Sequence, residues 1–148
     1  MIGGKAGPVR GYFFEELSLG QAEEATRTVG AADIEAFAAV SGDDNPVHLD
    51  AAFAAATPFK ERIAHGMLTA SYISALIGTR LPGPGAIYVS QTLSFRRPVH
   101  IGDAVTTRVE ITGLDDVKNR VTIACACTVG GKPVLEGEAV VIAPRRPA

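Results

Sequence analysis

The chain has no tryptophan, only two cysteines and three histidines, and no excess of charge of either sign, with 14 basic against 16 acidic residues. Balanced charge without runs gives no electrostatic footprint for nucleic acid or an anionic membrane. No stretch approaches the ~20 apolar residues that a membrane-spanning helix needs, and the N-terminus lacks the apolar segment of a signal peptide. These absences predict a cytoplasmic protein that binds neither nucleic acid nor a membrane.

The scarce cysteines and histidines also form no recognisable metal or disulfide pattern. Cys125 and Cys127 lie two residues apart in the run RVTIACACTV, so on a strand they would share one face and could not readily bond each other. We interpret them as small reduced core residues. The histidines His48, His65 and His100 lack the spacing of known metal sites, and no glycine-rich phosphate loop follows a strand. We expect neither a metal nor a cofactor.

A chain of 148 residues is most economically one domain. Residues 1–11 are rich in glycine and carry no periodicity, so we expect a flexible tail followed by a single domain over residues 12–148.

Helical patterns occupy the first half of the chain. Residues 31–42 have helical spacing and end at Gly42, and residues 49–59 predict a second short helix with Asp50 as N-cap and Pro58 at its end. The longest pattern covers residues 65–83. Its apolar residues continue round much of the circumference, which indicates a buried helix. The residues assigned to one side of it are Leu68, Tyr72, Ala75, Leu76 and Thr79.

Strand patterns dominate the second half. A first strand is predicted within residues 23–30, and four more runs follow the helices, at residues 86–95, 104–114, 120–129 and 132–143. Gly130-Gly131 predicts a tight hairpin between the last two. The order indicates an α+β protein with helices on one face of an antiparallel sheet. An antiparallel sheet wrapped around a long buried helix describes the hot-dog fold. Because so few strands do not close a barrel, we expect a homodimer joined edge to edge.

The stretch SGDDNPVHLD, between the first two helices, permits two interpretations. Polar residues between periodic segments are commonly only a solvated loop that ends one helix and caps the next. Alternatively, Asp43 and His48 form an acid/base pair on a turn that Pro46 stiffens. Histidine titrates near neutral pH, and a nearby carboxylate would fix its tautomer or favour its charged form. The pair could then share a water molecule.

The stretch AHGMLTAS at the start of the long helix also permits two interpretations. Gly66 either lets the chain turn into the helix or exposes backbone N–H groups at its positive end as an oxyanion hole. His65 is either the residue at which the chain enters the helix or a residue of the site, and we favour the first interpretation. Ser71 and Ser74 lack the G-x-S-x-G context of a nucleophile, so neither is predicted to be one.

Together, the D-x-N-P-x-H spacing at residues 43–48, the HGM motif and the downstream FRRPVHIGD resemble the (R)-specific enoyl-CoA hydratases of the MaoC-like hot-dog group. The likeness is strongest to the short single-domain type that feeds polyhydroxyalkanoate synthesis, and it runs from about residue 30 to the C-terminus. The resemblance implies (R)-specific hydration of trans-2-enoyl-CoA to (R)-3-hydroxyacyl-CoA by a hydro-lyase.

The resemblance also assigns roles to individual residues. It makes Asp43 and His48 the catalytic pair and gives the thioester oxygen to the N–H of Gly66. Ser74 and Asn45 become supporting residues. From the pattern alone, Leu68, Tyr72 and Ile87 are candidates for contact with the acyl chain.

Rival functions stay open on the sequence alone. A hot-dog protein can also be an acyl-CoA thioesterase, an acyl-carrier-protein dehydratase or a non-catalytic acyl-CoA-binding protein. Arg96 and Arg97 are too few to predict a carrier-protein surface, although they could meet the phosphates of coenzyme A. The sequence does not determine chain-length preference, the thioester carrier, the pathway, oligomers beyond a dimer, or which of Asp43 and His48 is formally the base.

Overall fold

A computed structural model describes residues 10–148 of the chain, so most of the tail expected over residues 1–11 lies outside the described residues. A single 3-10 turn, Phe14–Glu16, precedes the first strand. The helices are α1 (Ala31–Ser41), α2 (Pro46–Leu49), α3 (Ala51–Ala55) and α4 (Gly66–Thr79). The strands are β1 (Ala22–Thr28), β2 (Ile87–Gln91), β3 (Ser94–Phe95), β4 (Ala104–Asp115), β5 (Arg120–Val129) and β6 (Lys132–Ile142).

The strands form one antiparallel sheet in the order β1-β4-β5-β6-β2, with β3 also paired to β6. Gly130 and Gly131 join β5 to β6 with φ angles of 57° and 78°, as a tight hairpin of the favoured hand requires. The predicted strand at residues 86–95 is divided into β2 and β3. The other strand predictions are confirmed to within a residue or two.

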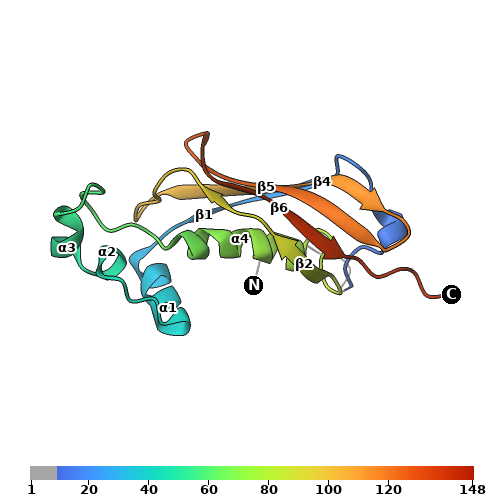
Figure 1. Ribbon diagram of the computed structural model, residues 1–148, viewed down its shortest axis with the longest axis horizontal. Coiled ribbons are helices and arrows are strands. Elements are labelled where there is room, and N and C mark those ends of the chain that lie inside the picture. The colour runs from blue at the N-terminus through green and yellow to red at the C-terminus, as the bar shows by residue number, and fades with distance from the viewer. Residues whose placement is uncertain (1–9) are drawn as a thin grey trace.

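The sheet and α4 form two layers (Figure 1). The long helix lies along one face of the sheet, and α1, α2 and α3 gather beyond its N-terminal end. Ile73 and Ile77 of α4 and Val109, Ile123 and Val141 of the sheet are all at most 1% exposed and belong to one core. Burying one such side chain contributes about 1.5–3 kcal/mol. This core is the rigid support on which the loops at the end of α4 are mounted.

The cysteine prediction is confirmed, because Cys125 and Cys127 are both free and buried on the face of β5 that packs on the core. Burial raises the pKa of Cys125 to about 11. A thiol with so high a pKa carries almost no thiolate at neutral pH, so these residues are packing groups.

Two expectations about the helices are wrong. The buried face of α4 consists of Leu68, Thr69, Ile73, Leu76 and Ile77, whereas Ala75 and Thr79 are exposed. The sheet therefore covers one side of α4, and apart from Met67 the exposed residues on the other side are small. The turn expected around Pro46 is the separate helix α2, because proline at the first position of a helix costs no hydrogen bond. Within the described residues, no helix has the length and apolar character needed to cross a membrane.

Candidate active site

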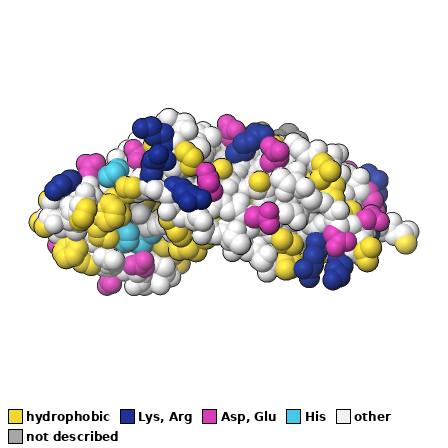
Figure 2. All heavy atoms as spheres, turned by 45° about the horizontal axis from the view of Figure 1, so that its top comes forward, with side chains coloured by type: hydrophobic (Ala, Val, Ile, Leu, Met, Phe, Trp, Pro, Cys, Tyr) yellow, Lys and Arg dark blue, Asp and Glu magenta, His cyan; other side chains and the backbone are white. Residues whose placement is uncertain are grey.

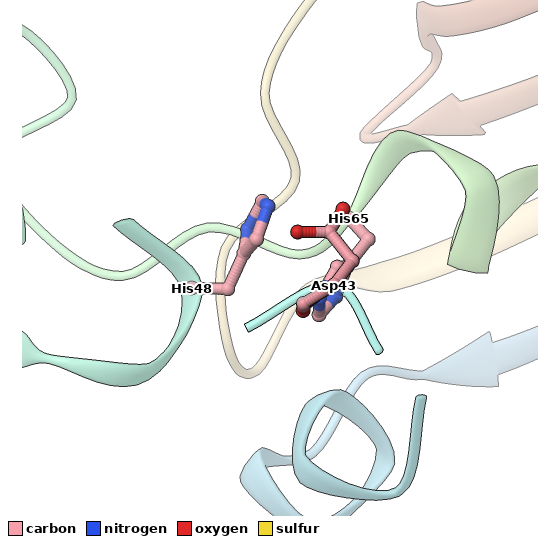
Figure 3. Close-up of side chains that lie close together, drawn as sticks. All are labelled: Asp43, His48 and His65. Carbon is pink, nitrogen blue, oxygen red and sulfur yellow. Dashed lines mark hydrogen bonds between the residues drawn. The ribbon is translucent and has the colours of Figure 1, made fainter. Parts of the chain in front are cut away.

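Three side chains from separate segments meet near the N-terminal end of α4 (Figure 3). Asp43 lies on the loop after α1, His48 on α2, and His65 directly before α4. Each offers an oxygen or nitrogen atom, and these atoms lie within 4.8 Å of one another. The structure thus brings Asp43 and His48 together and adds His65, for which the sequence favoured a place at the start of the helix over a place in the site.

Local hydrogen bonds shape the loop that carries Asp43. Gly42 ends α1 with a left-handed φ of 80°, and its N–H donates to the carbonyl of Ala38 at 2.9 Å. Asn45 caps α2, since its side-chain oxygen accepts from the N–H of Val47 at 3.1 Å. The N–H of Asn45 in turn donates to the carboxylate of Asp43 at 3.3 Å. Asn45 therefore braces the loop and orients the carboxylate, as a good N-cap residue can.

The orientation of His48 follows from one hydrogen bond. This side chain is only 8% exposed, and its Nδ1 lies 2.8 Å from the carbonyl oxygen of Ile63. A carbonyl can only accept, so Nδ1 carries the proton and donates. In the neutral ring, Nε2 is then an acceptor. His48 is consequently prepared to receive a proton from a water or hydroxyl group in the pocket.

His65 links the two predicted catalytic residues. Its Nε2 lies 2.8 Å from the backbone carbonyl of Asp43, and its ring stacks on His48 with centroids 3.8 Å apart and an interplanar angle of 27°. It is also the N-cap residue of α4, as the sequence predicts, but its side chain makes no capping hydrogen bond. The ring is instead 2% exposed and packed inside the site. A lone histidine before a glycine gives no local signal of such contacts.

Gly66 is the first residue of α4, where backbone N–H groups have no partner within the helix. In the described part of the chain, no hydrogen bond uses the Gly66 N–H. The ring of Phe95 crosses directly over this glycine, since a Cβ added at Gly66 would lie 2.6 Å from Phe95 Cε1. Only glycine permits this approach. Phe95 begins the FRRPVHIGD motif, but the sequence assigned it no role in the site.

These groups open into one cavity of about 550 Å³. Asp43, His48, His65 and Gly66 line it, and most of the remaining wall is apolar. Apolar wall residues include Phe59, Ile63, Met67, Phe95, Val99 and Leu135. An apolar cavity with a few convergent polar groups is typical of a small-molecule site. Figure 2 shows hydrophobic and histidine side chains together on the surface at the end of the molecule that carries α1–α3, with basic side chains beside them.

The other predicted site residues lie outside this cavity. Ser74 is on the exposed side of α4, and Ile87 is 60% exposed on the edge strand β2. Leu68 is buried in the core, and Tyr72 packs partly against it. None of these four residues lines the cavity. Their assignment to the acyl chain or to support of the site stays a prediction.

Asp43, His48 and His65 could in principle offer ligands to one metal ion. A tetrahedral site needs lone pairs that converge on a point about 2 Å from each nitrogen. The hydrogen bonds to Ile63 and Asp43 engage Nδ1 of His48 and Nε2 of His65, so Nε2 of His48 and Nδ1 of His65 are the nitrogens left with a lone pair. The same side chains also form a proton-transfer group that needs no metal.

The fold and site together define a hot-dog protein with an Asp/His cluster at the start of its central helix. Residues 16–130 match the model of the MaoC like domain, and the chain belongs to this family. The family and fold predicted from the sequence are confirmed.

Relatives agree over nearly the whole chain. An (R)-specific enoyl-CoA hydratase of Rhodospirillum rubrum is 53% identical over 91% of this chain and 94% of its own. A 3-hydroxybutyryl-CoA dehydratase of Methylorubrum extorquens is 50% identical over 93% of this chain and 88% of its own. Among solved structures, the R-hydratase PhaJ1 of Pseudomonas aeruginosa, in its unliganded form, is 51% identical with a TM-score of 0.87, covering 92% of this chain and 88% of that one.

The contact between Gly66 and Phe95 yields a stability prediction. Gly66→Ala should lower the free energy of unfolding by at most about 1 kcal/mol, because the new methyl group overlaps the ring of Phe95 but that ring is 54% exposed and can turn away. In a Phe95→Ala background the overlap is gone, so the two substitutions should be non-additive. Urea denaturation of the four proteins in this cycle measures the coupling. Additive losses would show that Phe95 does not cover Gly66 in solution.

Proposed function

We propose that the protein adds water to trans-2-enoyl-CoA and forms (R)-3-hydroxyacyl-CoA. The observation that carries this proposal is one apolar cavity holding the proton-accepting Nε2 of His48, the carboxylate of Asp43 and the unused N–H of Gly66. The names of the Rhodospirillum and Pseudomonas relatives support it, since both are (R)-hydratases about half identical to this chain. A dehydratase name, as in Methylorubrum, describes the same reaction run in reverse.

In the proposed mechanism, a water molecule donates one hydrogen bond to the Asp43 carboxylate and one to Nε2 of His48. Its oxygen attacks the β carbon of the enoyl group, and the electron pair of the double bond moves through the α carbon toward the thioester oxygen. Asp43 and His48 together take one proton from the water and return it to the α carbon. Because both bonds form on the face turned to Asp43 and His48, the product has a single configuration.

Gly66 stabilises the charge that develops in this step. The thioester oxygen becomes enolate-like when the β carbon is attacked, and the free N–H at the positive end of α4 is placed to donate to it. Such a donor, fixed before the reaction begins, typically contributes about 3–4 kcal/mol to transition-state stabilisation. The apolar wall strengthens the effect because it excludes water and lowers the local dielectric constant.

Two rivals are less compatible with these contacts. A thioesterase directs water at the carbonyl carbon and needs one general base for that attack, so it gives no reason for both Asp43 and His48 to lie beside Gly66. A non-catalytic acyl-CoA-binding protein would have no use for the hydrogen bond that leaves Nε2 of His48 free to accept a proton. An acyl-carrier-protein dehydratase would use the same chemistry, so only the carrier distinguishes it.

The pair assignment is tested by kinetics with crotonyl-CoA. Asp43→Asn and His48→Gln should each lower kcat by about 10²–10⁴-fold, because each removes a proton acceptor for the water. Asp44→Asn is the matched control, since this neighbouring carboxylate is exposed and does not line the cavity. Loss of the conjugated-thioester absorbance follows hydration, and an (R)-specific dehydrogenase reads the product. Thioester hydrolysis without hydration, or full activity in both variants, would contradict the proposal.

Arg96 and Arg97 line the same cavity at its exposed side and are proposed to hold the phosphates of coenzyme A. Arg96 makes only a weak, exposed ion pair with Glu136 at 3.7 Å, and Arg97 donates to the carbonyl of Pro133 at 2.9 Å. Exposed pairs of this kind contribute about 0–1 kcal/mol, so a phosphate can replace them at little cost.

The expected signature of phosphate binding is a change in KM. Arg96→Gln and Arg97→Gln should raise KM for crotonyl-CoA several-fold with kcat little changed, and the effect should shrink at high salt because ions screen exposed charges. Arg108→Gln, on the exposed side of β4, is the matched control. If all three variants keep the wild-type KM, the phosphates bind elsewhere. An acyl-carrier-protein substrate that is turned over far better than crotonyl-CoA would favour the dehydratase instead.

A second copy of the chain is proposed to pair with β2. This strand ends the sheet, and its outer edge has no partner among the described residues. Ile87, Tyr88 and Val89 form an apolar row that is 40–60% exposed on it. An unpaired apolar edge is a template for strand pairing, and a two-fold dimer pairs this edge with the same edge of a second copy.

Sedimentation tests the dimer. The wild-type protein should sediment as a dimer at micromolar concentration. Val89→Glu should shift it toward monomer, because a charge on the edge strand opposes pairing. Val117 lies on the turn between β4 and β5 and is 89% exposed, so Val117→Glu is the control and should leave the dimer intact. A monomeric wild-type protein would contradict the proposal.

A further inference from the structure

We infer that His65 is a positioning residue, which holds Asp43 and His48 in place relative to the N–H of Gly66. This inference rests on the proposed hydration activity and assigns a role to the third member of the cluster. His65 touches both proposed catalytic residues and is covalently joined to Gly66.

His65 tethers the loop that carries Asp43. Apart from the bond to His65, the hydrogen bonds of Asp43 are short-range, to Ser41 and Asn45 within two residues. The bond from Nε2 of His65 to its backbone carbonyl joins residues 22 positions apart. It is therefore the contact that fixes the loop against α4. Without it, the exposed carboxylate is oriented only by the loop's own turn.

His65 also orients the ring of His48. Among the described residues, the bond from Nδ1 of His48 to Ile63 is the one hydrogen bond that opposes rotation of this ring about its Cβ–Cγ bond. His65 stacks on one face of the ring at 3.8 Å and is itself packed against Phe37 of α1, with ring centroids 4.8 Å apart. His65 thus fills the space between α1 and α2. The stack blocks rotation of His48 and keeps its Nε2 directed into the cavity.

The buried, unpaired Nδ1 of His65 indicates that this residue does more than fill space. His65 is 2% exposed, and its Nδ1 is buried without a hydrogen-bond partner. Buried polar atoms are nearly always paired, and an orphaned one is unfavourable. A phenylalanine would fill similar space without that cost. The role of Nε2 explains why an imidazole stands here despite the unpaired Nδ1. Donation to the carbonyl of Asp43 requires the proton on Nε2, and Nδ1 is then left as an acceptor without a proton.

The kinetic test compares two substitutions at His65. Phe retains a ring for the stack but loses the donor, whereas Gln retains an amide N–H near the position of Nε2 but loses the ring. His65→Phe should lower kcat for crotonyl-CoA hydration about 10- to 100-fold with KM within about three-fold, because misplaced catalytic groups slow the chemical step more than binding. His65→Gln should recover a large part of that loss. His100→Gln, at the third histidine of the chain, is the control and should match the wild type.

The outcomes separate this inference from the proposed function. If the wild-type protein hydrates crotonyl-CoA and Asp43→Asn does not, but His65→Phe retains full kcat, positioning by His65 is wrong while the function stands. A change confined to KM in His65→Phe would reduce His65 to packing. If the wild-type protein shows no hydration, the proposed function itself fails.

A measurement on the unmodified protein covers the case in which the variants do not fold. Long-range proton–nitrogen NMR correlations report which ring nitrogen of each histidine carries the proton. His65 should be the Nε2–H tautomer and His48 the Nδ1–H tautomer. A proton on Nδ1 alone of His65 would overturn the inference whatever the kinetics show, because the tether to Asp43 could not then exist.

Discussion

The site depends on the fixed position of one short backbone segment, Ile63 to Gly66. The N–H of Ala64 donates to the carbonyl of Val99 at 2.7 Å, and Ile63 forms an antiparallel bridge with His100, so the segment is held like a short strand. The carbonyl of Ile63 orients His48, and the next peptide units carry the ring of His65 and the N–H of Gly66. Any shift of this segment would move the acid/base pair and the oxyanion donor together.

The arrangement concentrates a few polar groups in an otherwise apolar space. The ring of Phe95 packs on Gly66 more closely than a residue with a Cβ would allow. This ring closes one side of the cavity over the positive end of α4. Electrostatic interactions are stronger in such surroundings than in water, and they need no rearrangement when charge develops. The rigid contact between α4 and the sheet holds the N–H in place, while the loops around it supply the proton acceptors. Stability and chemistry therefore share the same helix.

The parts of the fold that local signals specify were predictable. Patterns within a few residues predicted the hairpin at Gly130-Gly131 and the end of α1 at Gly42. They also predicted that the two free cysteines of β5 share one buried face. The helix α2 was missed because Asn45-Pro46 is equally typical of a turn and of a capped helix start. The exposed side of α4 was assigned wrongly because alanine and threonine occur on either face, so only packing against the sheet distinguishes them.

The sequence by itself determined the order of the elements, the hot-dog class, and the proximity of an Asp and a His to a helix that begins with glycine, because each of these is written in short-range spacing. Only the tertiary structure decided which nitrogen of His48 is free, that His65 joins the cluster, that Phe95 lies over Gly66, and that Ser74 lies outside the cavity. These features arise from contacts between residues far apart in the chain. Their distances and directions depend on how the segments pack, and short-range sequence patterns do not specify that packing.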